Sequence, residues 1–322
     1  MKLSQPLPVC GLLSVLLIGL GAYNQRTPRA SVPPITEKQT PVKQTKLSNP
    51  PQSLPKNIVA PTAAPLPPPT VPKLDIRLTH RGFKTDPANF QVVCKSAAMA
   101  IARYYPKRTF KPILIPKADN GFPVKLDQRG PNGEPQIMLS IGDGWMWNQI
   151  AYQFAHEFTH ILINHNQPGA GPNHWINEAF CEAVSYQALK QMAKDWEHYP
   201  PYPNWRGYAK HHSSYADKYL GKSKARPGGM EFTAWFKKNE KALRMGKRYP
   251  KYGLYQYPAY QFYQVIKEDP SQLAALAYLN FGLKNPAIST QQYLARWKTV
   301  LPTAHKPFAD KIARSFGYSL PN

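Results

Sequence analysis

Cysteine is scarce in this sequence, which has only Cys10, Cys94 and Cys181 among its 322 residues. Three cysteines allow at most one intrachain disulfide, which excludes a fold held together by a disulfide framework. None of them lies in a C-x-x-C pair, so a zinc site built from thiolates is not expected. Cys181 falls within an apolar helical pattern, and we interpret it as a buried thiol rather than a nucleophile.

Acidic residues are also few: 18 Asp and Glu stand against 41 Lys and Arg, which gives a formal net charge of +23. This balance favours acidic partners, such as an acidic cell-envelope polymer or an anionic membrane surface, although a solvated basic surface is the simpler interpretation. The sequence has no RNP-like, zinc-finger or homeodomain motif, so specific nucleic-acid binding is not expected.

No hydrophobic run is long enough to span a bilayer comfortably, because roughly 20 apolar residues are needed. The longest run at the N-terminus, residues 9–20, has about a dozen residues, follows Lys2 and ends in Gly21 and Ala22. Residues 1–26 therefore resemble a secretory signal peptide with cleavage near Ala22. Leu20 fits that cleavage site poorly, so an uncleaved anchor remains an alternative. Either way we expect an exported protein, secreted or held in the periplasm or cell envelope.

Residues 27–72 are rich in Pro, Thr, Gln, Lys and Ser, with too little apolar content to form a core, and are predicted to be a disordered linker. Residues 73–144 are expected to form an α+β subdomain, with strands at 74–79, 110–115 and 136–141 and one helix at 89–105. Residues 145–322 are predicted to be mainly helical, with helix starts at Asp269-Pro270 and Ser289. The predicted fold class is α+β: a small mixed sheet with one helix, followed by a helical subdomain.

The segment 145–165 contains His156-Glu157-Phe158-Thr159-His160 in an apolar helical pattern, with Asp143 as a candidate N-cap. Four residues turn a helix by about 400°, so both imidazoles project from one face and can reach one zinc ion. Glu157 is rotated by about 100° from His156, where it can act on a zinc-bound water as general base. The spacing predicts a catalytic zinc site that lies between this helix and a neighbouring one.

A catalytic zinc ion needs a third protein ligand, and the following helical segment supplies a candidate in Glu178, 18 residues beyond His160. His165 is a rival, but it lies about 500° round the helix from His160 and points away from the same face. A mostly buried helix carrying two histidines and a glutamate needs partners for them, and a bound metal would provide these.

The motif H-E-F-T-H followed by W-I-N-E-A-F resembles the gluzincins, the zinc metallopeptidases that include thermolysin and the aminopeptidase-N enzymes. The resemblance implies a zincin-like active-site helix and assigns the metal to His156, His160 and Glu178. It also implies that Glu182 steadies a ligand histidine from behind and that Asn177 has a supporting role. The metzincin pattern is absent, because Ile163 and Asn166 stand where a glycine and a histidine are required.

The same resemblance implies a tyrosine that stabilises the oxyanion, and the stretch beginning at Tyr255 matches with Pro258 in place of a glycine. Rival donors are Tyr252, Tyr257 and Tyr260, together with His211 and His212. No G-x-M-E-N stretch precedes the zinc motif, so aminopeptidase specificity is not supported. Residues 136–141 are expected to form an edge strand that pairs with an extended peptide substrate.

Two functions are therefore predicted. The first is an exported zinc metallopeptidase that hydrolyses peptide bonds with a zinc-activated water and Glu157 as general base. The alternative is a basic envelope-associated binding protein with a structural or vestigial zinc site, in which Cys181 is the one cysteine near Glu178.

Overall fold

Among the described residues, all four strands precede residue 144 together with one helix, and the residues after it are mainly helical. The computed structural model describes residues 72–79, 83, 85–116, 121–141, 144–163, 171–225, 228–246 and 253–321. All of these belong to the second of two compact units, residues 66–322. The predicted signal segment 1–26, the linker 27–72 apart from Pro72, and the residues Asp143, His165, Asn166 and Tyr252 lie outside the described residues.

Four short strands lie side by side. Strand β1 (Ile76–Leu78) pairs in parallel with β2 (Ile113–Ile115), and β3 (Val124–Lys125) pairs antiparallel with β4 (Ile137–Met138). A single parallel bridge between Leu114 and Gln136 joins the two pairs, so the spatial order is β1, β2, β4, β3. The strands predicted at 74–79, 110–115 and 136–141 are each present in shortened form.

The expectation that residues 136–141 form the edge strand is wrong. β3 covers one side of β4, and the Leu114–Gln136 bridge occupies the other. The outer strand on this side is instead β3, which is only two residues long and follows Pro123; β1 is the outer strand on the other side. Too few residues show alternation there for the sequence pattern to reveal a strand.

Helix α1 (Pro87–Ala102) packs against β1 and against the later helices α2 (Trp147–Leu162) and α3 (His174–His198). The Asp86 side chain caps it by accepting the backbone N–H groups of Ala88 (2.7 Å) and Asn89 (3.0 Å), and Pro87 occupies the first helical position. Its buried residues include Phe90, which belongs to the core. The helix predicted at 89–105 therefore starts two residues earlier and ends three residues sooner.

The remaining helices build the larger part of the unit. They are α2 (Trp147–Leu162), α3 (His174–His198), α4 (Ala209–Ala225), α5 (Phe232–Met245), α6 (Gln256–Ile266), α7 (Thr290–Val300) and α8 (Lys306–Ser315), with short 3-10 helices at η1 (Gly171–Asn173), η2 (Pro203–Tyr208), η3 (Pro270–Tyr278) and η4 (Thr303–His305). Ser289 starts α7, as predicted, and forms a capping box with Gln292, whereas Asp269 caps η3 rather than an α-helix. The α+β prediction is confirmed at this coarse level, with helix predominating.

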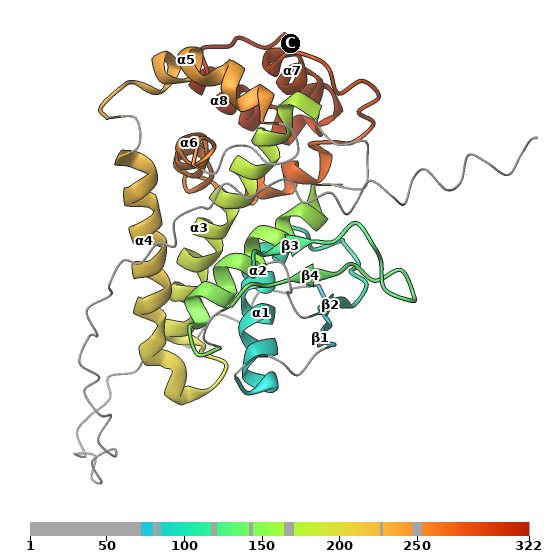
Figure 1. Cartoon of the computed structure of the whole chain (residues 1–322), viewed down its shortest axis with the longest axis vertical. Helices are drawn as coiled ribbons and strands as arrows, with labels where there is room; N and C mark the ends of the chain where they lie inside the picture. Colours follow the sequence, from blue (N-terminus) through green and yellow to red (C-terminus); the bar gives the residue numbers. More distant parts are fainter. Residues whose placement is uncertain are drawn as a thin grey trace, which may run out of the picture. The chain divides into compact units, whose positions relative to one another are not determined.

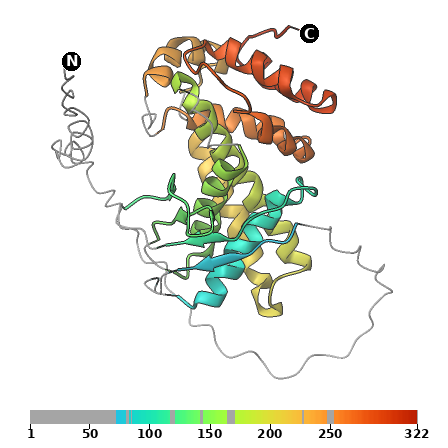
Figure 2. The ribbon, with the colours of Figure 1, turned by 90° about the vertical axis from the view of Figure 1, so that its right-hand side faces the viewer.

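Helix α3 runs through the middle of the unit, where it contacts α1, α2, α4 and α6 (Figure 1). The strands and α1 lie beside α2, whereas α5, α7 and α8 lie together at the other end (Figures 1 and 2). One hydrophobic core connects these parts and includes Phe154 and Phe158 of α2 and Trp175 and Phe180 of α3. This shared core holds α2 and α3 against each other, and both helices carry the predicted site residues.

Candidate metal centre

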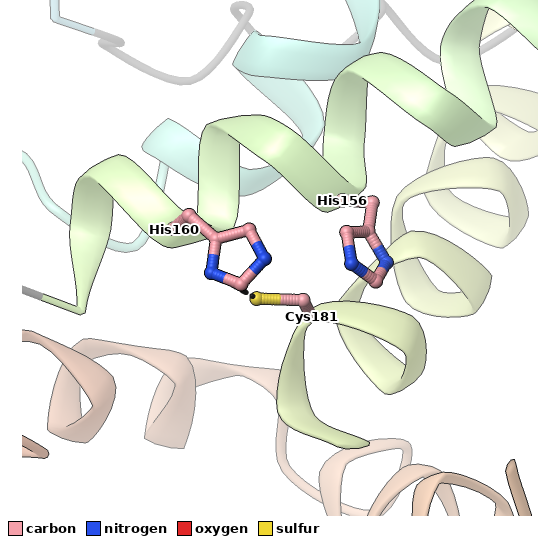
Figure 3. Close-up of side chains that lie close together, drawn as sticks. All are labelled: His156, His160 and Cys181. Carbon is pink, nitrogen blue, oxygen red and sulfur yellow. Dashed lines mark hydrogen bonds between the residues drawn. The ribbon is translucent and has the colours of Figure 1, made fainter. Parts of the chain in front are cut away.

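Helix α2 presents His156 and His160 on one face, as their spacing requires. The two imidazole rings lie 5.2 Å apart between centroids, and both project toward α3 (Figure 3). The His156 side chain is 12% exposed and that of His160 is 8% exposed. The pair is therefore nearly enclosed, and its ring nitrogens need partners inside the protein.

Glu178 of α3 supplies a partner to both histidines through the same ring position. Its Oε2 atom lies 3.2 Å from Nε2 of His156, and its Oε1 atom lies 3.4 Å from Nε2 of His160. In a tetrahedral zinc site with bonds of 2.0–2.2 Å, neighbouring ligand atoms are separated by about 3.3–3.5 Å. The three side chains are thus spaced as the ligands of one small cation would be, and two imidazoles with a carboxylate suit zinc.

The opposite edges of the two imidazoles are also occupied. Nδ1 of His156 lies 3.5 Å from Oε2 of Glu182, and Nδ1 of His160 lies 3.4 Å from the Cys181 sulfur. If a cation is bound, an Nδ1–H group donated to such a partner leaves the Nε2 lone pair of each ring to the cation. Both lone pairs would then meet beside the Glu178 carboxylate, which could complete the ligand set.

Glu182 is a buried carboxylate, 3% exposed, with two tyrosine partners. The hydroxyl groups of Tyr152 and of Tyr186 both donate to its Oε1 atom, the second at 2.7 Å. The Tyr186 hydroxyl also lies 3.1 Å from Oγ of Ser223 on α4. Residues from three helices therefore fix the carboxylate that faces His156.

Glu157 is next to His156 in the chain, but its carboxylate forms a hydrogen bond with strand β3. Its Oε2 atom accepts the backbone N–H of Lys125 on β3 at 2.6 Å, and the residue is 4% exposed. Burial raises the pKa of Glu157 to about 7, against the opposing effect of the His156 charge. A carboxylate with a pKa near neutrality is suited to accepting and returning a proton.

The charges of His156 and Glu178 stabilise each other. Burial lowers the pKa of His156, but its hydrogen bonds to Glu178 and Glu182 outweigh this and raise the pKa well above its usual value. Burial likewise raises the pKa of Glu178, yet the neighbouring histidines bring it well below its usual value. The site strongly favours an anionic carboxylate at position 178, which is the form that binds a metal.

Two donor sets share the histidine pair. Among the described residues, His156, His160 and Cys181 form a group whose donor atoms all lie within 4.8 Å of one another (Figure 3). The Cys181 sulfur, however, contacts Nδ1 of His160, whereas Glu178 contacts Nε2 of both rings. An ion bound at both Nε2 atoms would lie on the Glu178 side of the rings, away from the Cys181 sulfur.

Asn177 has polar contacts with the C-terminal helices rather than with the histidines. Its Oδ1 atom lies 3.1 Å from the Tyr293 hydroxyl of α7, which also contacts Oδ1 of Asn280 at 2.6 Å. Asn280 in turn donates to the backbone carbonyl of Ile163 at the end of α2. This chain of contacts ties the helix that carries Glu178 to the helix that carries His160.

Tyr255 precedes α6, is 8% exposed and lies near Tyr152 and Tyr186, the two tyrosines that hold Glu182. Burial raises the pKa of Tyr152 and of Tyr186, and the proximity of Glu182 and Tyr255 adds to the increase. The rival Tyr257 turns toward α5, where its hydroxyl donates to the Met230 carbonyl at 3.3 Å. Of these two tyrosines, Tyr255 is thus the one that lies closer to the residues of the candidate site.

His212 lies far from the site and cannot supply an oxyanion donor. Its ring contacts that of Trp196, with 4.6 Å between centroids. Trp196 follows Glu178 by 18 residues on the same helix, which places them about 27 Å apart along its axis. His211, the other histidine considered for this role, lies beside Tyr208 at the same end of α3, with 5.1 Å between ring centroids.

His174 is a site residue that the sequence analysis missed. It is the first residue of α3, and its Nε2 atom lies 3.0 Å from Oε1 of Glu178. The spacing of four residues between His174 and Glu178 was a readable signal, because it places both on one helix face. Three histidines therefore surround one carboxylate.

No protein-family model, no curated protein and no solved structure matches this chain. Among the described residues, no helix is both long and apolar enough to cross a membrane.

Proposed function

We propose that this protein is a zinc-dependent peptidase of the gluzincin type, with His156, His160 and Glu178 as the metal ligands. The supporting observation is the Glu178 carboxylate, which lies 3.2 and 3.4 Å from the Nε2 atoms of the two histidines. With Glu182 and Cys181 at the Nδ1 edges, both rings are oriented as metal ligands are. Zinc bound there would polarise a peptide carbonyl and lower the pKa of a coordinated water.

Glu157 is the proposed general base. Its pKa of about 7 allows it to take a proton from water near neutral pH and to return that proton to the leaving amine. The hydrogen bond from the Lys125 N–H group at 2.6 Å fixes Oε2 of Glu157, so Oε1 is the proposed proton acceptor. Tyr255 is proposed as the donor that stabilises the oxyanion.

Strand β3 is the proposed site for an extended peptide substrate. It is one of the two outer strands, the one beside β4, and within the described residues no further strand pairs with it. The contact between Lys125 and Glu157 brings β3 directly against the metal-bearing helix. A peptide that adds to this edge would pass beside the histidine pair.

A structural or vestigial zinc site in a basic envelope-associated protein is the second candidate. Cys181 favours this candidate, because its sulfur and a ring nitrogen of each histidine lie within 4.8 Å of one another. Structural zinc sites are often completed by cysteine. The net charge of +23 also suits binding to an acidic envelope polymer or an anionic membrane surface. We propose export in either case, with the N-terminal segment either cleaved or kept as an anchor.

Metal analysis of the full chain beside digestion of an unfolded, casein-type protein tests the proposal. We expect one tightly bound zinc per chain, digestion that a chelator abolishes, and loss of both properties in Glu178→Gln. Salt-sensitive binding to an acidic polymer with no hydrolysis would favour the second candidate. A wild-type chain that binds no zinc would refute both.

A further inference from the structure

His174 is held rigidly at the start of α3. The preceding residue, Asn173, is fully buried; its Nδ2 atom donates to the Ile288 carbonyl at 2.9 Å. Its Oδ1 atom accepts a hydrogen bond from Arg244 of α5 at 2.7 Å, and Arg244 also donates to the Ile288 carbonyl. The turn that carries His174 is therefore fixed by two other segments of the chain.

The two oxygen atoms of Glu178 have different surroundings. Oε2 faces Nε2 of His156 at 3.2 Å. Oε1 faces Nε2 of His174 at 3.0 Å and Nε2 of His160 at 3.4 Å, so His174 is its nearer partner. The His174 side chain is only 13% exposed, so little water can reach this contact and compete with it.

We propose that His174 is a positioning residue that donates its Nε2–H group to Oε1 of Glu178. This inference rests on the proposed function, because it concerns how Glu178 binds the metal. A carboxylate with one oxygen held by a donor presents the other oxygen to the ion, and hydrogen-bonded carboxylate ligands are typical of metal sites. His174 would thus keep Glu178 a one-oxygen ligand and leave a coordination position for water and substrate.

The opposing reading is that His174 is itself a fourth ligand. Its four-residue spacing from Glu178 on α3 is the same as that of the histidine pair on α2, so the helix geometry permits it. Four protein ligands would close the site and make it structural. The two readings differ in what glutamine can replace: its side-chain amide can donate a hydrogen bond to Oε1, but it is a poor ligand for zinc.

The full chain with His174→Ala and with His174→Gln separates these roles, with zinc affinity measured by chelator competition and geometry by the visible spectrum of the Co²⁺-substituted protein. We expect His174→Ala to weaken zinc binding by about 10–100-fold. We expect His174→Gln to restore most of this affinity and the wild-type Co²⁺ spectrum. His198→Ala, an exposed histidine at the far end of the same helix, is the matched control and should change neither readout.

Equal losses in both His174 variants, with a changed Co²⁺ spectrum in each, would show a ligand and overturn the positioning role. Wild-type affinity in both variants would also overturn it while leaving the proposed function intact. A wild-type chain that takes up neither zinc nor Co²⁺ would instead overturn the proposed function. Thermal unfolding of each variant shows whether it is folded. If His174→Ala does not fold, the zinc affinity and Co²⁺ spectrum of His174→Gln still distinguish the two roles.

Discussion

His156 and His212 are both enclosed by protein, yet their surroundings differ completely. His156 lies between Glu178 and Glu182, which raise its pKa well above the usual value against the effect of burial. His212 lies among Trp196 and Tyr208, and both of its ring nitrogens lack a hydrogen-bond partner among the described residues. Burial lowers the pKa of His212 to about 3.

Burial alone therefore does not mark a functional histidine. Helix α3 contributes to both regions, with acidic residues at its N-terminal end and an aromatic cluster at its C-terminal end. That cluster comprises Trp147, Trp196, Trp205, Tyr208 and His212. Changes at the acidic end, the proposed metal site, should therefore affect zinc binding and hydrolysis, whereas changes in the aromatic cluster should affect only stability.

The largest expected effect comes from Glu157→Gln. Removing the proposed general base should lower kcat for peptide hydrolysis by about 10²–10⁴-fold while one zinc per chain is retained. Steady-state kinetics and metal analysis on the same preparation measure the two quantities. Glu197→Gln, an exposed glutamate on α3, is the control and should hydrolyse peptides at the wild-type rate. Undiminished hydrolysis by Glu157→Gln would remove Glu157 from the mechanism.

The next effect concerns the tyrosines that hold Glu182. Tyr152→Phe and Tyr186→Phe each remove a hydrogen bond to this carboxylate, so zinc affinity should fall by about 10–100-fold. Chelator competition measures the change. Tyr219→Phe is a matched control, because Tyr219 stacks on Tyr152 but its hydroxyl contacts Tyr215. Equal losses in all three variants would mean that general packing, not Glu182, is responsible.

His212 should govern stability at acid pH without affecting zinc. Its pKa is about 3 in the folded protein and about 6.5 in the unfolded chain, so the unfolded state binds the extra proton as the pH falls below 6.5. The associated loss of unfolding free energy is about 2 kcal/mol by pH 5. His212→Leu should remove this part of the pH dependence in denaturant titrations, and His211→Gln, an exposed neighbour, should preserve it. Identical slopes for His212→Leu and wild type would contradict the account.

Cys181→Ala should have the smallest effect on the metal. The sulfur contacts Nδ1 of His160 rather than Nε2, and a thiol is only a weak hydrogen-bond partner, so its removal should leave zinc affinity within about threefold of wild type, or roughly 0.6 kcal/mol. Chelator competition on this variant, beside Glu178→Gln, compares the two candidate third donors directly. A chain that loses its zinc through Cys181→Ala would favour the closed, structural site.

Much of the candidate metal site could be predicted, because it depends on residue spacing within one helix. The separation of His156 and His160 by four residues places both rings on one face of α2, and the structure has them 5.2 Å apart. Glu178 was assigned from the resemblance to gluzincins, and the structure brings it to both rings. His174 was missed, although its four-residue spacing from Glu178 was visible in the sequence.

Contacts between helices could not be predicted from spacing. Tyr152 and Tyr186 meet at Glu182 only because α2 and α3 pack in one particular register. The same limit applies to the strands: the predicted edge strand is covered by β3, whose two residues are too few to show alternation. Nothing in the local pattern around His212 indicated the aromatic cluster, which joins residues from α2, α3, η2 and α4.

X-ray absorption spectroscopy of the zinc-loaded full chain reads the coordination shell directly. We predict only nitrogen and oxygen neighbours at about 2.0–2.2 Å, from two imidazoles, one carboxylate and a solvent molecule. A sulfur neighbour at about 2.3 Å would identify Cys181 as a ligand and contradict the assignment of Glu178 and an open catalytic position.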